Sequence, residues 1–314
     1  MNDDLKKFIV RVTLMAVTVV AIVVALLSVT PMEHRSYIYA NTLKKQALMD
    51  APSPRMAVVG GSNVFFGIDS QMLTDSLGYN AINMGSQIDI GLKYFMEDAA
   101  SVLEDGDVLV VMGEYEHFRD MMFGKPVELA AAMIYDPHRS LSTLNYYQVT
   151  NALVGVPVYL RNNIFYWMRY SVLGCPFTEG IYTTLNMDCR GDMINLTHAP
   201  SERILPAPDH LDRPMSESYL DSFAEVVKRL RRRIRVVVLP PVVTQSFYDV
   251  NRRHIEETAH ALESRGVGYA AAPSTAVMAD TLAFDFSYHP DSLGRRYNTR
   301  RVISDLKRVG VSKK

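Results

Sequence analysis

Two distant stretches of the sequence contain the residue types that a serine-based nucleophilic mechanism needs. In the first, Ser62 follows residues 58–61, where two valines run into a pair of glycines. We expect a buried strand there that turns sharply into a helix. The serine hydroxyl then lies near a helix N-terminus, where backbone N–H groups and the helix dipole stabilise negative charge. A serine that only caps the helix is the alternative explanation of this stretch.

The second stretch supplies a histidine and a carboxylate. A serine nucleophile needs a base that accepts its proton and a carboxylate that orients the base. Of the eight histidines, His289 has the best context, because Asp285 lies four residues before it in the same predicted loop. The carboxylate of such a pair can fix the tautomer of the imidazole. On this spacing alone, a surface histidine beside a solvated aspartate explains the pair equally well.

In their order along the chain, these stretches and one between them resemble the motifs of the SGNH (GDSL-like) hydrolase superfamily. Residues 61–69 resemble the first motif, in which the serine, here Ser62, is the nucleophile. Residues 83–87 resemble the second motif, whose glycine, here Gly85, supplies an N–H group to the oxyanion hole. The resemblance therefore implies that the backbone N–H groups of Ser62 and Gly85 hold the oxyanion.

Residues 285–294 resemble the last motif of the superfamily, in which the catalytic aspartate and histidine, here Asp285 and His289, precede a helix. The resemblance extends over roughly residues 55–115 and 235–308 and leaves the middle of the chain unaccounted for. Each motif is short, so the specificity comes from the ordered set.

The third motif of the superfamily, Gly-x-Asn-Asp, is absent from its place after the third predicted strand. The sequence there is Gly-Glu-Tyr-Glu-His, so Glu114 and Glu116 occupy the candidate third-motif positions. The asparagine that completes the oxyanion hole is missing, and an ionised glutamate cannot donate a hydrogen bond in its place. Loss of one such donor costs ~10²–10³ in rate, or about 3–4 kcal/mol.

The last motif has three residues between Asp285 and His289 where the superfamily often has two, and a tyrosine precedes the histidine. This pattern resembles the membrane-anchored branch that includes the D-alanyl-lipoteichoic acid biosynthesis protein and the alginate and cellulose O-acetylation proteins. Members of that branch carry an N-terminal anchor, act outside the membrane and work with a membrane-bound O-acyltransferase. The resemblance implies such a partner, and an acylated glycan or an acyl donor as substrate.

The N-terminal region fits an anchor. Residues 12–32 contain no charged residue and consist mainly of valine, alanine, leucine, isoleucine, methionine and threonine. At about 1.5 Å per residue, a helix of this length crosses a hydrocarbon core of roughly 30 Å. We expect a short tail over 1–11, an uncleaved transmembrane helix over 12–32 and a helical stalk over 33–54. A cleaved signal peptide is the competing explanation.

The two cysteines indicate in which cellular compartment the globular domain lies. Cys175 and Cys189 are the two cysteines of the chain, and they lie close together in a segment that contains proline and glycine. A disulfide that closes this short loop is typical of an oxidising compartment, although two unpaired buried thiols explain the pattern as well. Together with the anchor, the pair predicts a globular domain on the extracytoplasmic side of the cell membrane.

The rest of the chain indicates an α/β fold. An apolar share of 48%, a charged share of 21% and a formal net charge of −1 exclude a disordered acidic chain and a basic nucleic-acid binder. Alternating strands and helices imply a central parallel sheet, and we expect a three-layer α/β/α sandwich of the SGNH or flavodoxin-like type over 55–314. The predicted strands are 56–59, 81–84, 107–112, 235–239 and a last short one into which 266–270 leads. The predicted helices are 71–77, 90–103, 216–230, 250–264 and 295–308.

The α/β pattern is interrupted at about 118–214, which we interpret as a mostly helical insertion. The region is rich in tyrosine, methionine and asparagine, and one or two helices are predicted, around 144–154 and 158–171. Aromatic residues on helices usually belong to the core. A face that lies on the bilayer or on a partner is the second interpretation for a tethered domain.

These observations favour a membrane-anchored serine acyltransferase or esterase that acts on a cell-envelope polysaccharide. Ser62 attacks the acyl carbonyl, His289 acts as general base and then acid, and Asp285 orients the imidazole. Transfer and hydrolysis share every step up to the acyl-enzyme, and the exclusion of water separates them. The alternative is a non-catalytic partner protein of a membrane-bound O-acyltransferase, which the missing asparagine supports.

Other chemistries have weaker support. We expect no cofactor, because no glycine-rich dinucleotide or phosphate-binding motif occurs. We expect no metal, because His117, His138 and His198 lack ligand spacing with nearby carboxylates or cysteines. Nucleic acid is not an expected partner, since the basic run at 228–235 contains no aromatic residue for base stacking.

Overall fold

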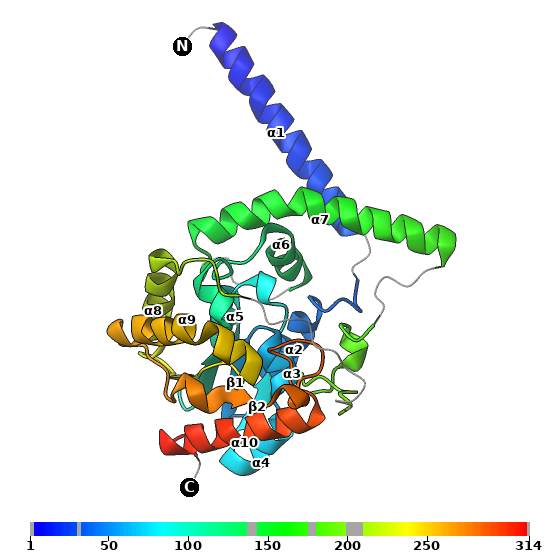
Figure 1. Cartoon of the computed structure of the whole chain (residues 1–314). Coiled ribbons are helices and arrows are strands. Elements are labelled where there is room, and N and C mark those ends of the chain that lie inside the picture. The colour runs from blue at the N-terminus through cyan, green and yellow to red at the C-terminus, as the bar shows by residue number, and fades with distance from the viewer. Residues whose placement is uncertain (1–2, 30–32, 137–142, 175–179, 199–209, 313–314) are drawn as a thin grey trace.

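The computed structural model of the chain describes residues 3–29, 33–136, 143–174, 180–198 and 210–312 (Figure 1). It is an α/β structure with a central parallel sheet of four strands in the order β2-β1-β3-β4. Each strand begins and ends within one residue of the prediction. The strands are β1 (Arg55–Gly60), β2 (Asn80–Asn83), β3 (Val108–Met112) and β4 (Arg235–Val238).

Side chains of the sheet are buried on both of its faces. In β1, Ala57 and Val59 belong to one apolar cluster, with side chains from α5 (Leu92–Ala100) and α8 (Glu217–Leu230). Met56 and Val58 belong to a second cluster, with side chains from α4 (Ser70–Leu77) and α10 (Ser292–Arg308). Burial on both faces explains why these strands are continuous apolar runs in the sequence rather than alternating ones.

A second, two-stranded parallel sheet is formed by β5 (Val243–Thr244) and β6 (Val277–Met278). The helix α9 (Gln245–Ser264) follows β5 and begins five residues before its predicted start at 250. The last short strand, into which 266–270 was predicted to lead, is β6, which begins only at Val277 and pairs with β5. Residues 266–270 make one backbone hydrogen bond to β4, from Ala270 N–H to Val238 O, and no ladder. Two glycines and a following 3₁₀ turn that begins at Pro273 prevent an extended pairing.

The helix α1 (Asp3–Val29) is long and apolar enough to cross a membrane, a property that an N-terminal signal sequence shares. It projects from the globular body and meets it at its C-terminal end (Figure 1). There Val23, Leu26 and Leu27 pack against an apolar cluster that includes Tyr159 and Leu160.

The helix expected between residues 33 and 54 is α2 (Ala40–Asp50), and it packs into the globular body instead of standing apart as a stalk. Its Lys44, Lys45 and Leu48 are buried. The Lys45 ammonium lies 2.6 Å from Asp98 Oδ1 and 2.7 Å from Asp136 Oδ2, in a site where all three side chains are nearly inaccessible to water.

Replacing Lys45 by alanine leaves two carboxylates in this buried site without their cation. We expect the free energy of unfolding to fall by about 3–5 kcal/mol in urea denaturation, the usual cost of removing one partner of a buried ion pair. Arg252→Ala is the matched control, because its ion pair with Glu256 is exposed and we expect no measurable change. Equal stability of the two variants would contradict this interpretation of the site.

The insertion contains α6 (Pro126–Tyr135), which the sequence did not predict, and α7 (Tyr146–Leu173). The stretches expected to be helical, around 144–154 and 158–171, form this single long α7, with Pro157 inside it. Packing on α6 supports the helix across the proline. A Cβ atom on Gly155 would lie 1.8 Å from Pro126 O, so the two backbones touch where the helices cross.

Candidate active site

Ser62 is the first residue of the short helix α3 (Ser62–Gly67), directly after β1. As the first helical residue it has a backbone N–H with no acceptor inside the helix. The turn requires small residues, because a Cβ atom on Gly60 would lie 2.5 Å from Met112 O and one on Gly61 would lie 2.3 Å from Glu114 Oε1. The predicted strand–turn–helix is therefore present, and the close approach of β3 accounts for the glycine pair.

His289 lies beside Ser62 although 227 residues separate them in the sequence. The distance from His289 Nε2 to Ser62 Oγ is 2.7 Å, and the distance from His289 Nδ1 to Asp285 Oδ1 is also 2.7 Å. The loop folds back on itself, since Phe284 N–H donates to His289 O and His289 N–H donates to Phe286 O. The structure thus brings together the three residues that the sequence pointed to.

Two aromatic residues that sequence reasoning did not assign to the site hold this pair in place. The ring of Phe66 is stacked on the His289 imidazole, with centroids 4.2 Å apart and planes 6° apart. The Tyr182 hydroxyl donates a hydrogen bond of 2.6 Å to Asp285 Oδ2. Phe66 could have been found from its place four residues after Ser62 on one helix, whereas nothing in the sequence connects Tyr182 to the last motif.

We expect Tyr182→Phe to lower kcat by about tenfold with little change in KM, because a hydrogen bond to a charged group contributes about 1.5–3 kcal/mol. The ring contacts of Tyr182 with Tyr37 and Phe66 remain in this variant. Steady-state kinetics with an activated acetyl ester provides the measurement. A kcat equal to that of the wild type would show that Asp285 needs no second donor.

Glu114 lies next to Ser62, since β3 is the neighbour of β1 and parallel strands end at the same edge of the sheet. Its Oε1 is 3.2 Å from Ser62 Oγ and accepts a hydrogen bond of 3.0 Å from Asn63 N–H. The pKa of Glu114 is raised to about 8, chiefly by burial and then by the charge of Glu116, while the hydrogen bond from Asn63 N–H opposes the increase. The carboxyl group is therefore mostly protonated at neutral pH, which corrects the assumption of an ionised glutamate.

Glu116, the other candidate third-motif residue, contacts the loop that carries His289. Its Oε2 accepts a hydrogen bond of 2.9 Å from the hydroxyl of Tyr288, the residue before the catalytic histidine candidate. The contact ties the loop after β3 to the loop that carries His289. Of the two glutamates, Glu114 is the one that can act on Ser62.

Gly85 does not offer its N–H group to the serine. That N–H donates a hydrogen bond of 3.0 Å to Asn83 Oδ1, two residues earlier, in the local turn that asparagine side chains favour. A Cβ atom on Gly85 would lie 2.5 Å from Phe65 N, so the glycine allows this loop to pack directly on α3. The role of oxyanion donor predicted for Gly85 therefore finds no support in this geometry.

The remaining predictions concern cysteines and metals. Cys189 is exposed, and Cys175 lies outside the residues that the structure describes, so the disulfide stays a prediction. Within the described parts of the chain, no group of three or more histidine, cysteine, aspartate or glutamate side chains is placed to hold a metal ion. Burial lowers the pKa of His117 to about 3, and His198 Nδ1 lies 2.5 Å from Asp291 Oδ2; His138 is outside the described residues.

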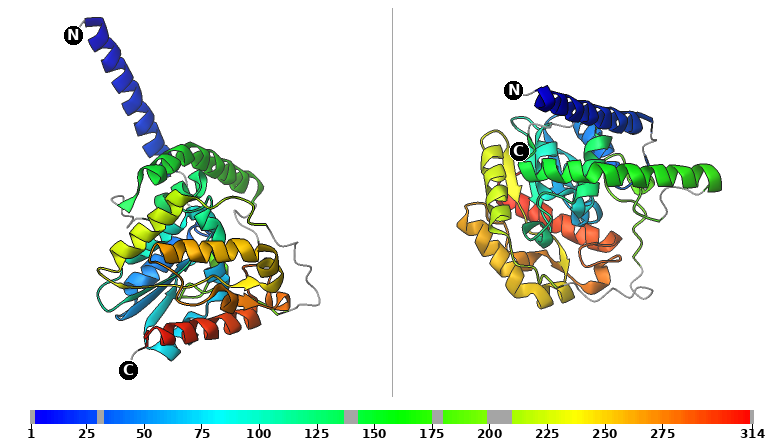
Figure 2. Two further views of the ribbon diagram at one scale, coloured as in Figure 1. Left: turned by 60° about the vertical axis from the view of Figure 1, so that its left-hand side comes forward. Right: turned by 90° about the horizontal axis from the view of Figure 1, so that it is seen from above.

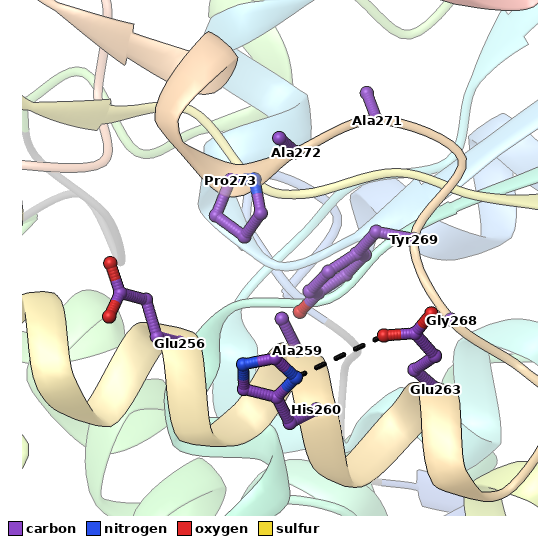
Figure 3. Close-up of a pocket in the computed structure, with 9 residues that line it drawn as sticks. All are labelled: Glu256, Ala259, His260, Glu263, Gly268, Tyr269, Ala271, Ala272 and Pro273. Carbon is purple, nitrogen blue, oxygen red and sulfur yellow. Dashed lines mark ion pairs between the residues drawn. The ribbon is translucent and has the colours of Figure 1, made fainter.

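A surface cavity of about 360 Å³ lies between α9 and residues 268–273 (Figure 3). Glu256, His260 and Glu263 line it from the helix, and His260 pairs with Glu263 at 4.0 Å. No residue of the Ser–His–Asp group lines this cavity. It is therefore separate from the candidate active site.

In comparisons with known proteins, no protein-family model matches the chain, and no curated protein matches it.

Proposed function

We propose that the protein is a membrane-anchored serine acyl-transfer enzyme, an O-acyltransferase or an esterase, that acts on a cell-envelope polysaccharide. The observation that carries the proposal is the chain of two 2.7 Å contacts that joins Ser62 Oγ, His289 and Asp285. In our proposal the fold is the three-layer sandwich of the SGNH superfamily. The buried clusters on both faces of the parallel sheet support this assignment.

The reaction has two halves. Ser62 gives its proton to His289 Nε2 as Oγ attacks the acyl carbonyl, and the tetrahedral intermediate collapses as the imidazolium protonates the leaving group. The acyl group then forms an ester with Ser62 Oγ. A hydroxyl group of a sugar or of water next gives its proton to His289 and attacks the ester. The imidazolium then protonates Ser62 Oγ as it leaves, which restores the serine. Asp285 accepts a hydrogen bond from Nδ1–H throughout, which keeps Nε2 free to take the proton.

Glu114 in its neutral form takes the place of the missing asparagine. Ser62 Oγ carries one proton, and a productive site requires that this proton go to His289. In the structure the Ser62 hydroxyl donates to Glu114 Oε1, and attack requires that it turn from this oxygen to His289, which a neutral carboxyl group permits more readily than an ionised one because it is the weaker acceptor. A neutral Glu114 beside the reacting centre, together with the free N–H of Ser62, stabilises the charge that develops on the carbonyl oxygen. An ionised Glu114 is a stronger acceptor. It holds the hydrogen bond of the Ser62 hydroxyl, keeps it from His289 and so opposes attack.

The polysaccharide substrate and the membrane-bound O-acyltransferase partner are supported by the resemblance of the motifs and by α1. A helix long and apolar enough to span a bilayer would tether the domain close to envelope glycans. In this arrangement the domain lies on the extracytoplasmic side.

A second candidate is a non-catalytic partner protein that keeps the fold and has lost turnover. The observation that favours it is the engagement of the Gly85 N–H by Asn83, which leaves fewer oxyanion donors than an active enzyme of this type has. The intact contacts of Ser62, His289 and Asp285 oppose it.

Turnover decides between the two candidates. The full chain in nanodiscs would be supplied with p-nitrophenyl acetate, with and without an oligosaccharide acceptor, and the product would be followed by mass spectrometry. We expect Ser62-dependent release of p-nitrophenol, and acetylated oligosaccharide if the enzyme is a transferase. Release that is equal for the wild type and Ser62→Ala would favour the non-catalytic partner.

A further inference from the structure

The end of α7 exposes an unusual number of apolar side chains. In its outer segment, residues 164–173, the exposed fraction of the large apolar side chains after Ile164 ranges from 41% for Tyr166 to 81% for Val172. Phe165 and Met168 are exposed to 62% and 50%. Soluble surfaces rarely carry such a contiguous apolar stretch unless another surface covers it.

The position of α1 indicates which surface that is. Tyr159 and Leu160, in the middle of α7, belong to the cluster on which the last turns of α1 pack. Figures 1 and 2 show α7 running across the foot of α1, with α1 rising on one side of it and the sheet with its helices on the other. A membrane that α1 crosses therefore meets the domain at α7.

The contacts also set the depth of α7. Val23, Leu26 and Leu27 lie two to six residues before the end of α1 at Val29. At about 1.5 Å per residue this is roughly 3–9 Å inside the end of the helix. Helices that lie in the interfacial plane bury their apolar face about 5–10 Å into the headgroup and acyl boundary. The middle of α7, where these contacts lie, is at that boundary if α1 spans the bilayer, and the outer segment continues the same helix from there.

The composition of α7 suits this location. Its 28 residues include two cations, Arg161 and Arg169, and no acidic residue, and both arginines are exposed. Tryptophan and tyrosine are the residues that concentrate at membrane interfaces, and arginine beside them favours anionic headgroups.

We infer that α7 is an interfacial helix whose outer segment lies in the headgroup region of the bilayer that α1 crosses, with Trp167 at the boundary between lipid and water. The contact would fix the orientation of the domain on the membrane, which a single spanning helix leaves free to rotate. This inference depends on α1 as a membrane span and is independent of the chemistry at Ser62.

The chain offers a direct probe, because Trp167 is its single tryptophan. The full-length protein would be reconstituted into vesicles of phosphatidylcholine and phosphatidylglycerol, and the tryptophan emission recorded. We expect a blue-shifted emission that is quenched by doxyl groups placed high on the lipid acyl chains and protected from iodide in the water. A red-shifted emission that iodide quenches and doxyl lipids do not, or protein that fails to float with the vesicles, would overturn the inference.

A matched control moves the probe to the far side of the domain. In Trp167→Phe with Tyr297→Trp, the new tryptophan lies on α10, at a position that is 44% exposed. Figure 1 places α10 at the end of the domain opposite α1. We expect iodide to quench this tryptophan and doxyl lipids to leave it unaffected. Lipid quenching at both positions would mean non-specific adsorption and would overturn the inference.

Discussion

Replacing His289 by alanine is expected to lower the rate of acyl transfer by about 10⁴-fold or more, as does the removal of a triad member in serine hydrolases. The imidazole lies 2.7 Å from the serine oxygen, and Glu114, the other acid–base group beside that oxygen, is a poor base in its neutral form. Without it, the serine hydroxyl keeps its proton at neutral pH and is a weak nucleophile. Steady-state kinetics with an activated acetyl ester measures the loss.

The triad interpretation makes a further prediction about non-additivity. Ser62 and His289 act as one unit, so the double variant Ser62→Ala, His289→Ala is expected to be no slower than either single variant. His260→Ala is the matched control, because this histidine is exposed on α9 and takes no part in the triad. Losses that multiply in the double variant, or a His289→Ala enzyme as fast as His260→Ala, would show that the two residues do not act together.

The second large effect is expected at Glu114. Its pKa of about 8 predicts that wild-type activity falls as the pH rises through about 8, because the ionised carboxylate withdraws the serine proton. Glu114→Gln replaces the acid by an amide that donates at every pH, so we expect this variant to keep most of its activity and to lose that alkaline fall. Glu114→Ala removes the donor and is expected to lose ~10²–10³ in rate across the pH range.

The same residue predicts a pH dependence of stability. The pKa of Glu114 is raised from 4.5 to about 8 in the folded protein, so its contribution to stability is complete below pH 4.5 and is lost as the pH rises towards 8. A tenfold change in proton affinity corresponds to about 1.4 kcal/mol, so the loss over this window is on the order of 5 kcal/mol. Urea denaturation should show the wild type losing stability relative to Glu114→Gln between these pH values. Parallel curves for the two proteins would mean that Glu114 is ionised in the folded state at neutral pH.

The sequence predicted best those features that depend on the pattern of neighbouring residues. Three strands of the main sheet, β1, β3 and β4, are apolar runs bounded by glycine, proline or charged residues, and all four strands were placed within one residue. Ser62, His289 and Asp285 could be singled out because a few residues around each carry the pattern. The order of the motifs then indicated that the stretch around Ser62 and the stretch with Asp285 and His289 form one site.

What the sequence did not predict depends on tertiary contacts. The sequence left open whether one or two helices lie around 144–154 and 158–171, and the packing of Gly155 on Pro126 supports a single helix through Pro157. The hydrogen bond from Tyr182 to Asp285 joins residues 103 positions apart, and no periodic pattern in the sequence predicts it. The protonation of Glu114 follows from its burial, which the residue type alone does not reveal.

The role of Gly85 shows a further limit. A short motif identifies the residue, but the direction of its N–H depends on the neighbouring side chain, here Asn83, which accepts that hydrogen bond. Asn83 in turn donates to Val64 O and to Asp192 Oδ1, so the insertion helps to hold this turn in place. A motif thus predicts the site more securely than it predicts the hydrogen bonds within it.

The most direct test of the central claim is covalent labelling of the serine. The full-length protein, Ser62→Ala and His289→Ala would each be treated with a fluorophosphonate probe in nanodiscs and measured by intact mass, with the adduct located by peptide mapping. The account predicts one adduct on the wild type, at Ser62, and none on either folded variant. Folded wild-type protein that stays unlabelled, or an adduct that persists in Ser62→Ala, would contradict the assignment of Ser62 as the activated nucleophile.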